Sequence, residues 1–194
     1  MTDARVAVLV SGGGTNLQAL IDAQEKGILK SGRIAIVVSS NKEAYALKRA
    51  ENAGIPTAVT ENGENFEKSL IEAIDGAGAD FIVLAGFMKI LSESFVKRYE
   101  KRIINVHPSL IPSFCGEGFY GLKVHRAALD YGVKVTGATV HYVNEIPDGG
   151  EIIAQKAVTI RENDTPETLQ KRVMKLAEHK ILPLALEKCI SERE

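Results

Sequence analysis

The feature that most constrains this chain is a series of short, uniformly apolar runs, each separated from the next by a segment with helical periodicity. Residues 5–10 (RVAVLV), 34–39 (IAIVVS) and 81–85 (FIVLA) are the clearest of these runs. Strands that are apolar on both faces are typical of a parallel sheet covered by helices on both sides. The sequence therefore predicts a three-layer α/β fold around a mostly parallel, twisted sheet of the Rossmann-like kind.

The segments between these runs predict helices of ordinary length. Leu17, Leu20 and Ile21 recur at helical spacing after the first run, and Gly54 and Pro56 end a second helical segment. We expect helices from Thr15 to about Gly27, around 43–53, from 66 to 76 and around 92–100, with further short strands at 56–59 and 103–106.

The pattern changes in the second half of the chain. Residues 135–143 and 151–160 predict two strands joined by NEIPDGG, which leaves no room for a helix, so we expect an antiparallel pair at one side of the sheet. Thr165 before Pro166 predicts the start of a long C-terminal helix that Pro183 kinks or divides. No linker or repeat interrupts this order, and residues 1–194 predict one domain.

Composition narrows the class of protein. The 194 residues carry 24 basic and 25 acidic side chains, well interleaved, which argues against nucleic acid as a partner. No apolar run approaches the roughly 18–20 residues that span a bilayer, so we expect no membrane partner. MTDARVAVLV reads as a first strand and not as a signal peptide. We expect a cytoplasmic protein in which Cys115 and Cys189 are reduced.

The loop SGGGTN, residues 11–16, lies between the first strand and the first helix. Backbone N–H groups and the helix dipole favour an anion at such a position. Leu17 stands where a dinucleotide fingerprint has its third glycine, and the second strand ends without an acidic residue for a ribose. We predict a phosphate monoester site here, with a plain strand-to-helix turn as the alternative.

Asn105 and His107 stand at the end of the strand at 103–106 and, being two residues apart, lie on the same side of the chain. They offer a hydrogen-bond donor and a general acid or base, although a lone histidine at a strand end is often structural. Pro108 restricts how His107 is presented. Asp148, before two glycines, is a turn on its own but would raise the pKa of a nearby His107 and orient its ring.

Two other features have competing interpretations. FIVLAGFMKIL, residues 81–91, is mostly core, but the apolar residues after its strand would also wall a pocket for a flat aromatic ligand. His125, His141 and His179 have no metal-like spacing, and we predict no metal site.

SGGGTNLQAL, SNKEAYALKRA, LAGFMKIL, INVHPSLIPSF, GATVHYV and DGG occur in this order over nearly the whole chain. Together they resemble the phosphoribosylglycinamide formyltransferase family, the folate-dependent enzymes of purine biosynthesis. The resemblance implies direct transfer of a formyl group from 10-formyltetrahydrofolate to the amino group of glycinamide ribonucleotide. It also implies a phosphate-binding half at about 1–100 and a folate-binding and catalytic half at about 101–194.

The resemblance assigns roles residue by residue. Asn105 would hydrogen-bond the formyl oxygen, protonated His107 would share that task and move protons, Asp148 would keep His107 charged, and Thr139 would place a hydroxyl near the substrate. Positions that match the family's substrate-binding residues are Gly12, Gly13, Gly14, Thr15, Asn16, Gly86, Pro108, Lys175 and Glu178. Those that match its folate-binding residues are Met88, Lys89, Ile90, Leu91, Val96, Asn105, Val143, Asn144, Glu145, Ile146 and Asp148.

The connector FCGEGFYGLKVH, residues 114–125, is longer than the usual family version, and its glycines suggest a mobile flap over the ribose side of the substrate. The alternatives on the same scaffold are formyltetrahydrofolate deformylase, which sends the formyl group to water, and a non-catalytic sensor of nucleotide phosphates. Methionyl-tRNA formyltransferase needs an RNA-binding domain that we do not see in this sequence. We expect small-molecule partners only and a monomer or weak homodimer.

Overall fold

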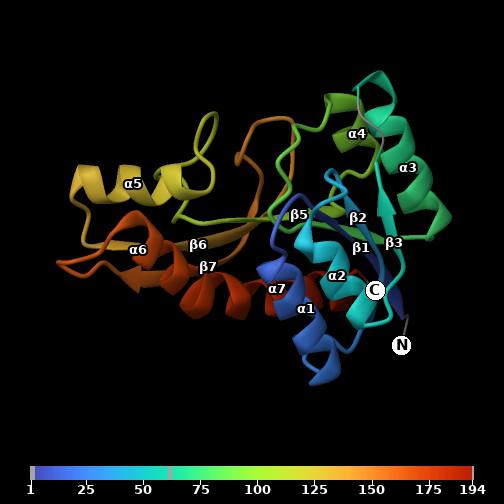
Figure 1. Ribbon diagram of the computed structural model, residues 1–194, viewed down its shortest axis with the longest axis horizontal. Helices are drawn as coiled ribbons and strands as arrows, with labels where there is room; N and C mark the ends of the chain where they lie inside the picture. Colours follow the sequence, from blue (N-terminus) through green and yellow to red (C-terminus); the bar gives the residue numbers. More distant parts are fainter. Residues whose placement is uncertain (1–2, 61–62, 194) are drawn as a thin grey trace.

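A seven-stranded sheet runs through the computed structural model, which describes residues 3–60 and 63–193 (Figure 1). The ends of the predicted 1–194 domain, residues 1–2 and 194, lie outside the described residues. The strand order is β3-β2-β1-β4-β5-β6-β7, and β1 to β5 are parallel. The strands are β1 (Ala4–Val10), β2 (Gly32–Ser39), β3 (Thr57–Val59), β4 (Phe81–Leu84), β5 (Ile103–His107), β6 (Val135–Tyr142) and β7 (Ile152–Thr159).

Alternate residues of β1 pack into two separate cores, which is why this strand is apolar throughout. Val6, Val8 and Val10 lie in one buried cluster with residues of α1 (Thr15–Glu25), α2 (Tyr45–Asn52) and α7 (His179–Ser191). Ala7 and Leu9 lie in the other cluster with α3 (Phe66–Gly76) and α4 (Glu93–Arg98). A short 3₁₀ turn, Gly63–Asn65, precedes α3. The predicted three-layer, mostly parallel fold is confirmed.

The C-terminal strands reverse direction. β6 is antiparallel to β7, as predicted, and it is also antiparallel to β5, with Asn105 opposite His141 and His107 opposite Thr139. Between β5 and β6 the structure has a helix, α5 (Leu122–Tyr131), that the sequence analysis did not predict. The predicted flap at 114–125 is therefore a loop only as far as Gly121, and its last four residues belong to α5.

The long C-terminal helix begins as predicted, with Thr165 capping the N-terminus of α6 (Pro166–Val173) and Pro166 in its first turn. Pro183 was predicted to kink or divide this helix, and division is wrong, because Pro183 lies inside the continuous helix α7. The departure from α geometry is a π turn at Met174–Glu178, directly before α7. Pro183 cannot donate a hydrogen bond to the carbonyl one turn earlier, and the wider turn stands just upstream of that position.

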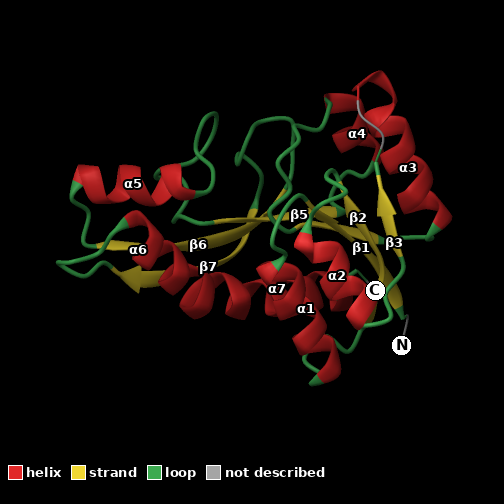
Figure 2. Cartoon of the chain, viewed as in Figure 1, coloured by secondary structure: helices red, strands yellow, loops and turns green. Residues whose placement is uncertain are grey.

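Three loops rise from the same side of the sheet and meet near its centre (Figure 2). They follow β4, β5 and β6, and they carry the segments that the sequence analysis singled out for chemistry. In an open α/β sheet, this is the side where ligands gather, outside the carboxyl ends of the parallel strands.

Candidate active site

A cleft of about 430 Å³ lies over the carboxyl ends of β1, β4 and β5. It brings together most of the residues predicted for chemistry and for the acceptor, and Met88 from the predicted folate site: Gly12, Gly13, Gly14, Thr15, Asn16, Gly86, Met88, Asn105, His107, Pro108, Asp148 and Glu178. A larger hollow of about 650 Å³ between α1 and α7 shares only Thr15 with the predicted site. The smaller cleft is therefore the candidate active site.

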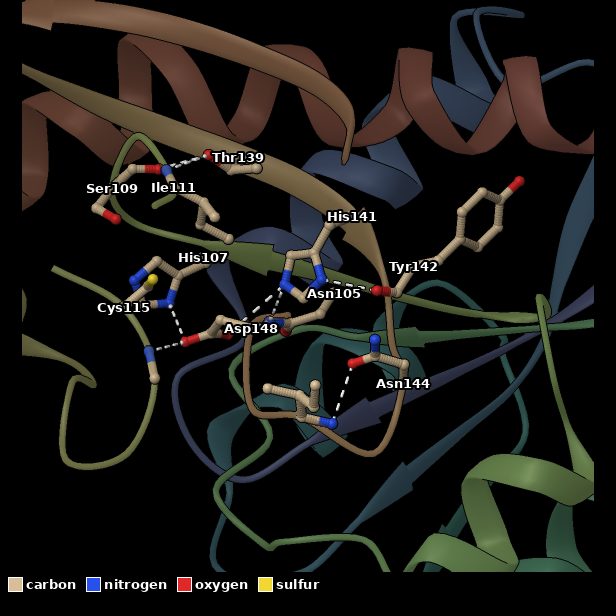
Figure 3. A network of polar contacts seen from close by, with 12 residues as sticks. Asn105, His107, Ser109, Ile111, Cys115, Thr139, His141, Tyr142, Asn144 and Asp148 are labelled. Atoms are coloured by element: carbon tan, nitrogen blue, oxygen red, sulfur yellow. Dashed lines mark hydrogen bonds and ion pairs between the residues drawn. The ribbon is translucent and has the colours of Figure 1, made fainter. Parts of the chain in front are cut away.

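Asn105, His107 and Asp148 converge in this cleft although the first and last are 43 positions apart (Figure 3). His107 Nδ1 lies 3.3 Å from one carboxylate oxygen of Asp148. The Asn105 side-chain nitrogen lies 3.5 Å from the other oxygen, at the limit of a hydrogen bond. Two side chains from the end of β5 thus share one carboxylate from the β6–β7 loop.

The Asp148-Gly-Gly sequence places that carboxylate through close packing. Asp148 has φ 55°, in the left-handed region where Asp and Asn are the best tolerated residues after glycine. A Cβ on Gly150 would lie 1.7 Å from the carbonyl oxygen of Tyr142, so only glycine fits there. The backbone N–H of Gly116 donates to Asp148 at 2.9 Å, which ties the flap loop to the carboxylate. The glycines are needed to fold the β6–β7 loop back onto β6.

Charges around the carboxylate are coupled. Burial raises the pKa of Asp148, but a hydrogen bond from His141, the charge of His107 and the Gly116 N–H together hold it below its usual value. Burial lowers the pKa of His107, and this effect exceeds the opposing effects of Asp148 and the Phe114 carbonyl. Asp148 therefore favours the charged His107 ring, in the predicted direction, and burial opposes it. The charge that His107 carries with substrates bound stays a prediction.

The glycine loop owes its shape to contact with α2. Gly14 has φ 69°, and a Cβ on it would lie 2.6 Å from the Cβ of Ala46. The backbone N–H of Ala46 donates to the Gly12 carbonyl at 3.0 Å, and the Arg49 guanidinium donates to the Gly13 carbonyl at 2.8 Å. Residues of α2 thus bind the carbonyl groups of this loop. The loop lines the cleft at the start of α1, where backbone N–H groups favour an anion.

Asn16 and Glu178 form a buried polar pair at the same end of the cleft. The Asn16 side-chain nitrogen donates to Glu178 at 2.8 Å. Burial raises the pKa of Glu178 to about 7, despite the opposing effect of that hydrogen bond. The Asn16 side-chain oxygen is buried without a hydrogen-bond partner in the described residues. Glu178 ends the π turn, a departure from helix geometry that is frequent at functional sites.

Some predicted residues lie outside the cleft lining. The hydroxyl of Thr139 is fully buried, donates to the Ser109 carbonyl at 2.7 Å and accepts hydrogen bonds from Ile111 and Gln155. The Thr139 hydroxyl therefore holds the turn after His107, and its predicted place near the substrate stays a prediction. Lys175 is exposed and is not part of the lining.

The residues predicted for folate divide into a packed group and an exposed group. Leu91, Val96 and Val143 pack with α3 and α4 in the second core cluster. Met88, Ile90 and Ile146 are exposed, Ile90 by 91%. Lys89 is also exposed, and its ammonium group lies 5.9 Å from the centre of the Phe66 ring. In the β6–β7 loop, the Asn144 side chain accepts a hydrogen bond from the backbone N–H of Ile146, and Glu145 is exposed.

Sequence reasoning missed several residues at the site. His141 contacts both Asn105 and Asp148, and only the β5–β6 register reveals this. The Phe114 carbonyl lies 2.9 Å from His107 Nε2. His125 is fully buried in the cleft wall, where burial lowers its pKa to about 4 and neither ring nitrogen has a partner in the described residues. Phe119, Tyr120, Gln170 and Met174 also line the cleft.

Two further observations concern metal sites and membrane-spanning helices. Across residues 3–60 and 63–193, no group of three or more His, Cys, Asp or Glu side chains is placed to hold a metal ion. In the same part of the chain, no helix combines the length and the apolar character that a membrane span requires.

Comparison with known proteins gives consistent results. The family model described as formyl transferase matches residues 4–186. Phosphoribosylglycinamide formyltransferase of Escherichia coli is 40% identical over 186 residues, with 93% of this chain and 84% of that protein covered. The trifunctional purine biosynthetic protein adenosine-3 of Bos taurus is 48% identical over 95% of this chain, but the match spans 18% of that protein.

Solved structures show the same likeness. Glycinamide ribonucleotide transformylase 1 from Symbiobacterium toebii superposes with a TM-score of 0.90 at 39% identity, covering 98% of this chain and 89% of that one. Phosphoribosylglycinamide formyltransferase from Brucella melitensis gives a TM-score of 0.88 at 43% identity, with 98% and 97% covered. The chain spans 62% of the length of the chloroplastic relative from Arabidopsis thaliana.

Proposed function

The chain belongs to the formyl transferase family, and from this premise we propose that it transfers the formyl group of 10-formyltetrahydrofolate to the amino group of glycinamide ribonucleotide. The products are formyl-glycinamide ribonucleotide and tetrahydrofolate, in the de novo synthesis of purines. The observation that carries the proposal is a single cleft that contains an anion-binding loop at one end and Asn105, His107 and Asp148 at the other.

The anion end suits the acceptor. The acceptor, glycinamide ribonucleotide, has one phosphate. Residues 12–14, with Thr15 and Asn16, offer backbone N–H groups at the start of a helix, and the loop lacks the dinucleotide fingerprint. Beyond the loop, Asn16 and Glu178 present a free amide oxygen and a carboxyl group to the ribose hydroxyls. Gly86 and Pro108 form the cleft wall between the two ends. Lys175, exposed one turn before Glu178, adds positive charge outside the lining.

The folate fits the other rim. Met88, Ile90 and Ile146 expose apolar side chains that a flat pterin ring would cover. Leu91, Val96 and Val143 give this rim a packed base. The backbone of the loop from Val143 through Asn144 and Glu145 to Asp148 offers hydrogen bonds to the polar edge of the ring, and Lys89 offers a charge to the folate tail.

Protonated His107 donates from Nε2 to the formyl oxygen, and Asp148, 3.3 Å from Nδ1, stabilises this cation. Asn105 donates to the same oxygen as negative charge develops there. The proton that the attacking amine releases passes to the departing folate nitrogen through water held by Asp148. No covalent enzyme intermediate is required.

The flap loop takes part by releasing His107. Its Phe114 carbonyl accepts a hydrogen bond from the ring nitrogen that must face the formyl oxygen, and Gly116 binds Asp148. Substrate binding therefore exchanges the Phe114 contact for a contact with the formyl group. The proposed partners are small molecules only, and the proposed active form is a monomer or weak homodimer.

The test is an assay of tetrahydrofolate release from 10-formyltetrahydrofolate with and without glycinamide ribonucleotide. We expect release only when the acceptor is present, with formyl-glycinamide ribonucleotide formed in equal amount, and loss of both in His107→Ala. Release of tetrahydrofolate at the same rate without the acceptor would contradict this proposal and show that the protein is a deformylase. No turnover under either condition would leave a non-catalytic phosphate sensor as the function.

A further inference from the structure

A second histidine, His141, adjoins the proposed oxyanion donor. Its ring on β6 is 1% exposed and lies opposite Asn105 on β5. His141 Nε2 lies 3.1 Å from the Asn105 side-chain nitrogen and 3.6 Å from Asp148, while His141 Nδ1 lies 2.8 Å from the carbonyl oxygen of Tyr142 (Figure 3). The ring thus sits between a carbonyl on one side and an amide and a carboxylate on the other.

The carbonyl group of Tyr142 shows which nitrogen of the His141 ring carries a proton. A carbonyl oxygen can only accept a hydrogen bond, so at 2.8 Å His141 Nδ1 carries a proton. If the ring is neutral, Nε2 is then an acceptor and draws the NH₂ group of Asn105 toward itself. In that state the Asn105 carbonyl oxygen faces the cleft, where it would repel the formyl oxygen. The contact between the Asn105 side-chain nitrogen and His141 Nε2, at 3.1 Å, has this orientation of the amide.

The proposed function needs the opposite orientation of the same amide. Nitrogen and oxygen of an asparagine side chain exchange places by a half-turn of the group, with almost no change in shape. With the NH₂ group toward the formyl oxygen, the Asn105 oxygen faces His141 Nε2, which must then donate a proton. Both ring nitrogens are protonated in that state.

We propose that His141 is a positioning residue which, as an imidazolium cation, holds the Asn105 amide with its NH₂ group toward the formyl oxygen. This rests on the proposed function for its role in turnover. The half-turn brings the Asn105 oxygen to about the 3.5 Å now separating its nitrogen from Asp148, which is repulsive. The cationic ring offsets this cost because its Nε2–H lies 3.6 Å from the same carboxylate.

The charges facing His141 are compatible with a cation. Asp148 supplies the negative charge, and His107 lies beyond that carboxylate. The other face of β6, through Ala138 and Val140, packs into the apolar cluster with α6 and α7, and β7 places Ile152 opposite His141. A positive His141 also lowers the pKa of His107. One carboxylate, that of Asp148, therefore faces two imidazole rings, those of His141 and His107.

The first test measures the protonation of the His141 ring nitrogens and needs no enzymatic turnover. The chain has four histidines, so ¹⁵N-histidine spectra of the whole protein, assigned with His141→Gln, resolve each ring. We expect both His141 nitrogens to be protonated at pH 7. A His141 ring with a single proton would overturn the inference, whether or not the protein formylates glycinamide ribonucleotide.

The second test separates positioning from a merely structural role. His141→Leu fills similar space but cannot donate, so we expect kcat to fall about 100-fold, the usual loss for one oxyanion donor, with both KM values within about threefold. His141→Gln offers an uncharged NH₂ group to Asn105, and its kcat should recover to within about tenfold of wild type. Equal kcat losses in the two variants, or losses confined to KM, would overturn the inference.

Discussion

The two ends of the cleft are built from different groups. The proposed anion end is built mainly from the backbone of the glycine loop, which is fixed by contact between Gly14 and Ala46. The proposed catalytic end is lined by the side chains of Asn105, His107 and Asp148, and the pKa values of His107 and Asp148 depend on one another. The first end should therefore be sensitive to a single methyl group, and the second to a single charge.

Removing one charge at the catalytic end should have the largest effect. Asp148→Asn keeps the side-chain shape and suits the left-handed backbone at φ 55°. Because the neutral amide no longer stabilises a cationic His107, we expect kcat to fall at least about 100-fold while the unfolding temperature changes little. Asp130→Asn, an exposed acid on α5, is the matched control and should retain full activity. A variant that kept a tenth of the wild-type rate would refute the role of the Asp148 charge.

Adding one methyl group at the anion end should damage the loop itself. Gly14→Ala introduces a Cβ 2.6 Å from Ala46 and a side chain at φ 69°, so we expect about 2–5 kcal/mol of lost stability and a higher KM for glycinamide ribonucleotide. Denaturant unfolding and steady-state kinetics measure both. Gly13→Ala, with nothing within 4 Å of the new Cβ, is the control for stability. Equal stability of the two variants would show that contact with α2 does not set the loop.

Glu178 is the titrating group at the anion end. Its pKa of about 7 in the folded protein exceeds the ordinary value of 4.5, so its contribution to stability is complete below pH 4.5 and is lost as pH rises toward and through 7. Glu178→Gln cannot ionise. We expect it to match wild type near pH 4.5 and to be more stable at pH 8, by up to about 3 kcal/mol. Unfolding curves at the two pH values check this, and a pH-independent difference would contradict it.

A charge change at the exposed folate rim should have the smallest effect. Lys89 is exposed, so a contact with the folate tail is weakened by water and by salt. We expect Lys89→Gln to raise the KM for 10-formyltetrahydrofolate about 2–5-fold at low salt, without changing kcat. The difference should vanish in high salt. A change in kcat would place Lys89 closer to the chemistry than the proposed function does.

The sequence predicted those parts of the fold that depend on local patterns. The apolar runs located β1, β2 and β4, and the SGGGTN and NVHP segments located both ends of the cleft. It failed where distant pairing decides the outcome. His141 became visible only from the β5–β6 register, and the buried hydrogen bonds of Thr139 could not be read from its neighbours in sequence.

Two other differences have local causes that the pattern concealed. The start of α5 lies directly after Gly121, and the three glycines before it suggested a loop through residue 125. Pro183 suggested a kink or a division of the last helix, but Pro183 lies within the continuous helix α7, and a π turn stands upstream of it. Competing signals of this kind are resolved by packing against neighbouring elements, which a linear sequence does not display.

Glycinamide riboside, the acceptor without its phosphate, gives the most direct comparison of the two ends. Kinetic constants for the riboside and the ribonucleotide, measured with the same folate, separate binding by SGGGTN from chemistry at Asn105, His107 and Asp148. Our account predicts that KM rises at least about 100-fold for the riboside while kcat stays within a few-fold. Equal KM values for the two acceptors would contradict it, because the loop would then not bind the phosphate.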